Sequence, residues 1–120
     1  TWLPHRQPRM LLRVVVKEIE SWLLADRENI ANFLQIALSK IPDRPEGLED
    51  PKQALINLAR TSKSKRIRAA LVPEEGSTAS EGRLYTSELS QFVNQQWDPA
   101  NARRNAPSLE RCCLRLQALA

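Results

Sequence analysis

Residues 11–38, LLRVVVKEIESWLLADRENIANFLQIAL, decide the fold class because two hydrophobic patterns meet within them. Residues 11–16 are rich in β-branched side chains and apolar on both faces, which is typical of a strand covered on both sides. From Asp26 onward, apolar residues recur at helical spacing: Ile30, Phe33, Leu34, Ala37 and Leu38. The stretch predicts one central strand that runs through a short helix, residues 17–26, into an amphipathic helix.

Helix starts recur along the rest of the chain. Asp26 is expected to cap the helix that follows it, because its carboxylate can accept hydrogen bonds from the free amides of the first turn. Asp50-Pro51 and Asp98-Pro99 combine a cap with proline at the first helical position, where a missing amide costs nothing. The rest of the chain contains three further apolar stripes at helical spacing: Ala54, Leu55, Leu58 and Ala59; Leu89, Phe92, Val93 and Trp97; and Leu109, Cys112, Cys113 and Leu116.

These patterns predict a mostly α fold of the α+β class, with about six short helices around one core and one or two short strands. Residues 1–10 contain two prolines and no periodicity, so we expect an irregular N-terminal arm. Residues 11–120 are expected to form a single mostly helical domain. A lone strand cannot satisfy its own backbone, so its partner must lie elsewhere in the chain, in a second copy or in a further segment.

Composition limits the class of protein. The chain has 120 residues, 42% of them hydrophobic and 27% charged, and a net charge of +4, which fits one globular domain with a solvated surface. No apolar run is long enough to span a membrane. The cysteines, Cys112 and Cys113, are adjacent, and neighbouring cysteines rarely form a disulfide with each other because the geometry is strained. We therefore expect free thiols and a cytoplasmic location.

Glu18 and Glu20 are the candidate metal ligands. On extended backbone their spacing directs both carboxylates to one face, and paired carboxylates can hold Mg²⁺. The alternative is that both are solvated residues at a helix N-terminus, where negative charge is favoured. Catalysis through histidine would depend on His5 alone, and the three glycines form no phosphate-binding loop.

A basic run supplies the candidate nucleic-acid contacts, namely Lys63, Lys65, Arg66 and Arg68. Such residues can neutralise phosphates in a salt-dependent way. The alternative is a solvated helix face, since no interleaved aromatic residue is present to stack on a base. Trp22 and Trp97 are expected to be core anchors rather than ligand platforms.

Several stretches together resemble the C-terminal half of a bacterial family of TOPRIM-like proteins, domain-of-unknown-function family 4276. The run from Glu18 to Asp26 is the most specific, and Asp50-Pro51-Lys52 follows it. Leu84-Tyr85, Phe92-Val93, Trp97 and residues 106–109 complete the pattern. The residues that carry the resemblance are Glu20, Trp22, Asp26, Pro51, Lys52, Tyr85 and Ser108.

The resemblance implies a truncated TOPRIM-like protein, in which acidic residues on a parallel sheet bind Mg²⁺ for nucleic-acid processing or phage defence. The family's Glu-Gly turn and later acidic pair do not occur in this chain, so we expect it to be inactive alone. The implied partners are nucleic acid and an ATPase. The alternative function is a protein-interaction module without a catalytic site, which pairs with a second copy or with the ATPase through the exposed strand edge.

Overall fold

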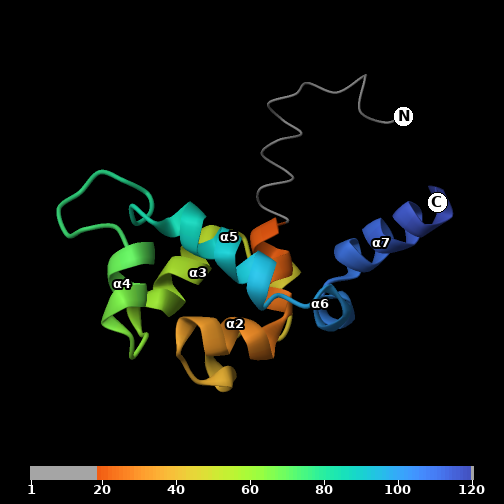
Figure 1. Ribbon diagram of the computed structural model, residues 1–120, viewed down its shortest axis with the longest axis horizontal. Helices are drawn as coiled ribbons and strands as arrows, with labels where there is room; N and C mark the ends of the chain where they lie inside the picture. Colours follow the sequence, from red (N-terminus) through yellow and green to blue (C-terminus); the bar gives the residue numbers. More distant parts are fainter. Residues whose placement is uncertain (1–18, 120) are drawn as a thin grey trace.

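A computed structural model of the chain describes residues 19–119 (Figure 1). Residues 19–25 are helical. Six α-helices and two 3₁₀ helices follow within the described range: α2 (Arg27–Leu34), η1 (Leu38–Lys40), η2 (Pro45–Gly47), α3 (Pro51–Arg60), α4 (Lys65–Leu71), α5 (Tyr85–Gln95), α6 (Pro99–Asn105) and α7 (Pro107–Leu119). None of the helices in this range is long and apolar enough to cross a membrane.

The predicted α+β class is wrong for the part of the chain that the structure describes. Between residues 19 and 119 there is no strand, and the helices outnumber the six expected. The helices and the turns between them pair the backbone locally, and packing is helix on helix, so no sheet is needed. The predicted arm, residues 1–10, and the predicted strand, residues 11–16, lie outside the described residues, as does Glu18.

Side-chain caps begin three of the helices. The Asp50 carboxylate accepts a hydrogen bond from the Gln53 amide at 3.0 Å, and the Asp98 carboxylate accepts one from the Ala100 amide at 2.9 Å. Proline occupies the next position in both cases. Ser64 caps α4 by accepting from the Ile67 amide at 3.2 Å. The two predicted Asp-Pro helix starts are therefore confirmed, and their caps satisfy amides that the helices leave free.

Asp26 stands at the start of α2, as predicted, but its carboxylate does not cap that helix. The side chain is fully buried and accepts hydrogen bonds from the Asn29 side chain at 2.8 Å and from the Asp98 amide at 2.7 Å. It lies 3.4 Å from the Asn101 side-chain amide as well. The carboxylate thus joins the start of α2 to the start of α6, a role that sequence spacing does not reveal.

The buried side chains form two clusters. The larger one joins residues 19–25 to α2, α3, α4 and α5, and the rings of Phe33 and Phe92 meet in it with centroids 5.0 Å apart. The smaller one consists of Ala25, Ala102, Ala106 and Leu109, with Trp22, Trp97 and Cys113 packed against it. Because Trp97 borders both clusters, it anchors α6 and α7 to the rest of the molecule.

Gly82 fixes the return of the long loop between α4 and α5. Its amide donates to the Leu71 carbonyl at 2.9 Å, and the Leu84 amide donates to the Ala70 carbonyl at 3.1 Å. A Cβ atom at residue 82 would lie 2.3 Å from the Ala70 oxygen, so no side chain fits there. This close approach sets the position of Tyr85, the first residue of α5.

Candidate interaction groove

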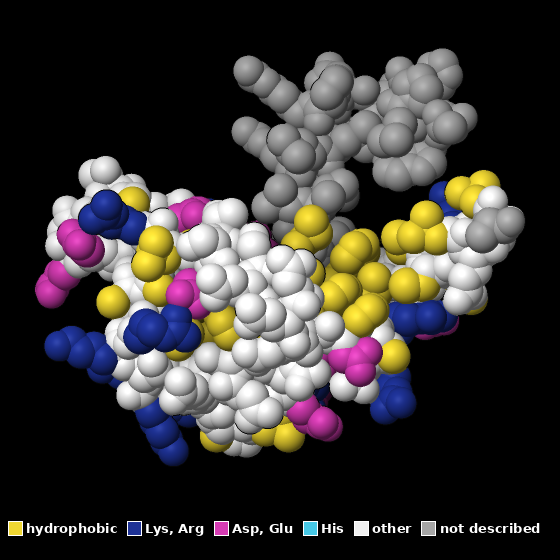
Figure 2. All heavy atoms as spheres, viewed as in Figure 1, with side chains coloured by type: hydrophobic (Ala, Val, Ile, Leu, Met, Phe, Trp, Pro, Cys, Tyr) yellow, Lys and Arg dark blue, Asp and Glu magenta, His cyan; other side chains and the backbone are white. Residues whose placement is uncertain are grey.

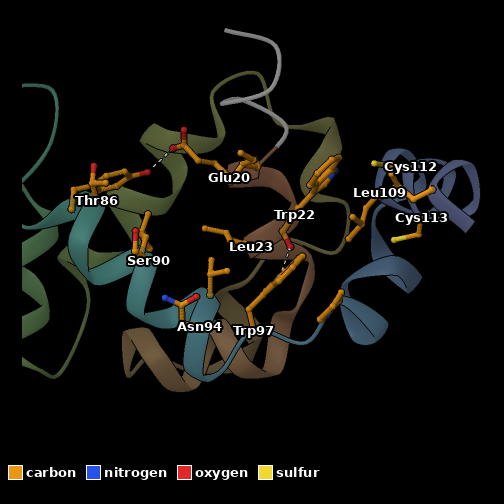
Figure 3. Close-up of a pocket in the computed structure, with 16 residues that line it drawn as sticks. Glu20, Trp22, Leu23, Thr86, Ser90, Asn94, Trp97, Leu109, Cys112 and Cys113 are labelled. Carbon is orange, nitrogen blue, oxygen red and sulfur yellow. Dashed lines mark hydrogen bonds between the residues drawn. The ribbon is translucent and has the colours of Figure 1, made fainter. Parts of the chain in front are cut away.

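An apolar groove of about 720 Å³ separates residues 19–25 and α5 from α7 (Figure 3). Apolar side chains gather on the same part of the surface, between the main body and α7 (Figure 2). We define the groove by its lining: Ile19, Glu20, Trp22, Leu23, Tyr85, Thr86, Leu89, Ser90, Val93, Asn94, Trp97, Pro99, Leu109, Cys112, Cys113 and Leu116. Residues 19–25, α5, the first residue of α6 and α7 thus contribute to one predominantly apolar surface.

One end of the groove is polar. The Tyr85 hydroxyl donates a hydrogen bond of 2.5 Å to Glu20 Oε2, and both side chains are buried. Burial raises the pKa of Glu20 above its ordinary value of 4.5, although the Tyr85 hydrogen bond and Lys52 oppose this shift. Burial and the same hydrogen bond raise the pKa of Tyr85. This hydrogen-bonded pair forms the polar end of the groove.

Lys52 lies beside this pair. Its ammonium group is 5.5 Å from the centre of the Tyr85 ring and forms an ion pair of 2.5 Å with Glu81. Cations over aromatic faces are attracted by the ring's quadrupole. Asp50 and Glu81 act on Glu20 through their charge and help to raise its pKa. The end of the groove therefore combines charges from α3, from the loop before α5 and from residues 19–25.

Hydrogen bonds attach the start of α7 to the opposite side of the groove. The Trp22 indole donates to Ser108 Oγ at 2.8 Å. Ser108 in turn donates to Glu46 Oε1 through both its hydroxyl, at 2.6 Å, and its amide, at 2.9 Å. The Trp97 indole donates to the Trp22 carbonyl at 3.0 Å, as Figure 3 shows. Both tryptophans are half-buried and pack against the core clusters as expected, but they also line the groove, which the sequence did not predict.

The structure brings together the residues that carry the family resemblance. Glu20 pairs with Tyr85, and Trp22 pairs with Ser108, although 65 and 86 positions separate them in the chain. Lys52 lies beside Tyr85, Pro51 begins α3 and is buried, and Asp26 is fully buried. These side chains make hydrogen bonds and packing contacts that connect distant helices.

Only one of the two predicted Mg²⁺ ligands, Glu20, lies among the described residues. Glu20 is bonded to Tyr85, and no group of three side chains among residues 19–119 could hold a metal ion. Glu20 also lies on a helix rather than on the extended backbone that the pairing with Glu18 assumed. Glu18 lies outside the described residues, so the pairing of the two carboxylates stays a prediction.

The predicted basic residues lie around the start of α4, and two of the four have specific partners. Arg66 forms an ion pair with Glu88 at 2.6 Å, and Arg68 donates to the Ser62 carbonyl. Lys63 and Lys65 are exposed. Arg66 is nevertheless 62% exposed, so three of the four side chains lie at the surface, and their contact with nucleic acid stays a prediction.

Sequence reasoning missed the groove itself. It predicted the stripe Leu109, Cys112, Cys113 and Leu116 as a buried helix face, but only Leu109 is buried and Leu116 is 62% exposed. Both cysteines are free and half-buried in the groove wall, not enclosed in the core. The apolar stripe and the further leucines of α7 were visible in the sequence. Periodicity shows that a helix face is apolar but does not show which surface covers that face.

Comparison with known proteins adds no relative. The chain matches no protein-family model, no curated protein and no solved structure. The resemblance to family 4276 therefore stays a prediction, and the groove must be interpreted from its own geometry.

Proposed function

We propose that this chain is a protein-interaction module that pairs with a second copy of itself through the groove. The observation that carries the proposal is that one chain supplies both a groove and an apolar helix beside it. Leu116 and Leu119, three positions apart on one face of α7, are 62% and 84% exposed. Helix-in-groove contacts bury such faces in protein complexes.

A second copy is the occupant that the chain itself provides. In a two-fold symmetric pair, each α7 can lie against the groove of the partner, so that one surface serves both chains. Apolar side chains buried in this way contribute roughly 1.5–3 kcal/mol each. The predicted mode of pairing, an exposed strand edge, has no basis in residues 19–119 because they contain no strand.

Sedimentation equilibrium or light scattering over a range of concentrations tests the pairing. Leu116→Glu is expected to weaken dimerisation at least about tenfold, since it places a charge in the apolar contact and each tenfold step corresponds to about 1.4 kcal/mol. Gln117→Glu is the matched control, because it adds the same charge to the same helix. A wild-type chain that remains monomeric at all concentrations, or equal weakening by both variants, contradicts the proposal.

The rival function, a TOPRIM-like fragment for Mg²⁺-dependent nucleic-acid processing, makes a different prediction. It requires salt-dependent nucleic-acid binding that is lost when Lys65 and Arg66 are neutralised. A gel shift without that loss leaves the basic residues outside any binding site. The free thiols of Cys112 and Cys113 support a reducing, cytoplasmic location as part of our proposal.

A further inference from the structure

A pocket of about 380 Å³ lies apart from the groove, where the segment that follows α2 meets the turn between α3 and α4 (Figure 1). No residue lines both this pocket and the groove. Of the described residues that line it, Lys40 and Lys63 are the only charged ones, and we call it the lysine pocket. Its wall therefore carries positive charge and no carboxylate.

Backbone hydrogen bonds hold the two walls of the lysine pocket together. The Lys63 amide donates to the Gln35 carbonyl at 3.3 Å, which joins the turn between α3 and α4 to the end of α2. The amides of Gln35 and Ile36 donate to the last carbonyls of α2 at 3.2 Å and 3.1 Å, an arrangement that commonly ends a helix. Within the turn, the Ser62 hydroxyl accepts from the Ser64 amide at 3.0 Å. The shape of the pocket is therefore set by the protein's own bonds.

The polar side chains of the lysine pocket have donors to offer. Both lysine side chains are exposed and form no ion pair within residues 19–119. By contrast, glutamates pair with Lys52 and Arg66 elsewhere in this range. The side-chain amides of Asn32 and Gln35 also line the pocket, and they make no hydrogen bond within the same residues. The lining thus presents two cationic and two neutral donor groups, which suits a ligand with several negatively charged acceptor oxygens.

We propose that the lysine pocket binds a phosphate ester, with Lys40 and Lys63 holding the phosphate group. Lysine is a common phosphate partner in proteins because its ammonium group is a compact positive charge. Ala31, Ile36 and Ala37 supply an apolar part of the lining, which can contact the organic group that carries the phosphate. The volume lies within the range of small-molecule sites. This site goes beyond the proposed function, because it uses no residue of the groove.

Titrations of the ¹⁵N-labelled full chain, followed by amide chemical shifts, test the site. Adenosine monophosphate is expected to shift the amides of the pocket lining, whereas adenosine, which lacks the phosphate, is expected to leave them unchanged. Lys40→Gln and Lys63→Gln should each weaken binding roughly tenfold, because each removes a hydrogen bond to a charged group. Lys65→Gln is the matched control and should bind as wild type, since Lys65 is also exposed but does not line the pocket.

A single-stranded oligonucleotide, titrated in the same way, distinguishes two sources of the phosphate. Binding of adenosine monophosphate supports a site for small phosphate esters, and shifts of the same amides by the oligonucleotide alone support a site for the nucleic-acid backbone. Asn32→Asp places a carboxylate in the lining with little change of shape and should abolish the shifts in either case. The proposal is overturned if neither probe shifts these amides, if adenosine shifts them as much as its monophosphate, or if Asn32→Asp binds as wild type. Equal weakening by all three lysine variants also overturns it.

Discussion

The main core and the α6–α7 region contain the same kind of apolar stripe but bury it to different extents. In the main core, Ile30, Leu55 and Phe92 are almost completely inaccessible to solvent. In α7 only Leu109 is buried, and exposure increases toward the end of the helix to 84% at Leu119. Equal periodicity therefore does not mean equal burial, because burial also requires a facing surface.

The difference follows from the number of neighbours. Helices α3, α4 and α5 pack in succession, and α2 and residues 19–25 join them in one cluster. Helix α7 packs chiefly on the short helix α6 and extends away from the other helices (Figure 1). The first region is a closed core, while the second region presents an apolar face.

Phe92→Ala should produce the largest loss of stability. Removal of a buried aromatic ring leaves a cavity, and we expect the free energy of unfolding to fall by about 3–5 kcal/mol. Leu119→Ala is the matched truncation in α7 and should change it by about 0.5 kcal/mol or less, because the side chain is exposed. Urea denaturation measures both. Similar losses for the two variants would remove the distinction between the regions.

Asp26→Asn tests the connection between the two regions. The carboxylate accepts from several donors, whereas an amide offers one acceptor oxygen and adds donors of its own. We expect a loss of about 2–3 kcal/mol, since hydrogen bonds to buried charged groups are among the strongest. Asp43→Asn is the control, because that carboxylate is 90% exposed and forms an ion pair with Arg27 at the surface. A loss as small as that of the control would show that α6 is held by apolar packing alone.

Glu20→Gln should have the smallest effect on the free energy of unfolding, and this effect should depend on pH. Burial raises the pKa of Glu20 in the folded state, so the folded chain binds more protons than the unfolded chain. The stabilisation from the protonated carboxyl is present below the unfolded pKa and is lost as pH rises through the folded pKa. We expect the variant to be more stable than wild type at pH 7, because the neutral amide avoids the cost of burying a carboxylate.

The free energies of unfolding of both chains at pH 4 test the direction of this pH dependence. There the wild-type carboxyl is largely protonated, so the two chains should have similar stability. Glu49→Gln, at an exposed position, should show no such pH-dependent difference. A variant that is less stable than wild type at pH 7 would indicate that the carboxylate is favoured in its site.

Much of the helical fold could be predicted from local sequence. Asp50-Pro51 and Asp98-Pro99 begin helices because their caps need only residues two or three positions away. The stripes around Ile30 and Phe92 lead to buried residues where those helices have neighbours, but α2 ends at Leu34, and Leu38 and Val93 are 43% and 39% exposed. The expected strand was predicted from the β-branched run of residues 11–16, which lies outside the described residues, and residues 19–119 contain no strand.

The sequence by itself determined where helices begin, which faces are apolar and that the cysteines do not pair with each other. Only the tertiary structure decided that Asp26 holds α6, that Glu20 meets Tyr85 and that α7 leaves its apolar face beside a groove. The physical reason is the sequence separation over which each interaction acts. Caps and periodicity act over a few residues, whereas a groove exists only when segments far apart in the chain have packed together.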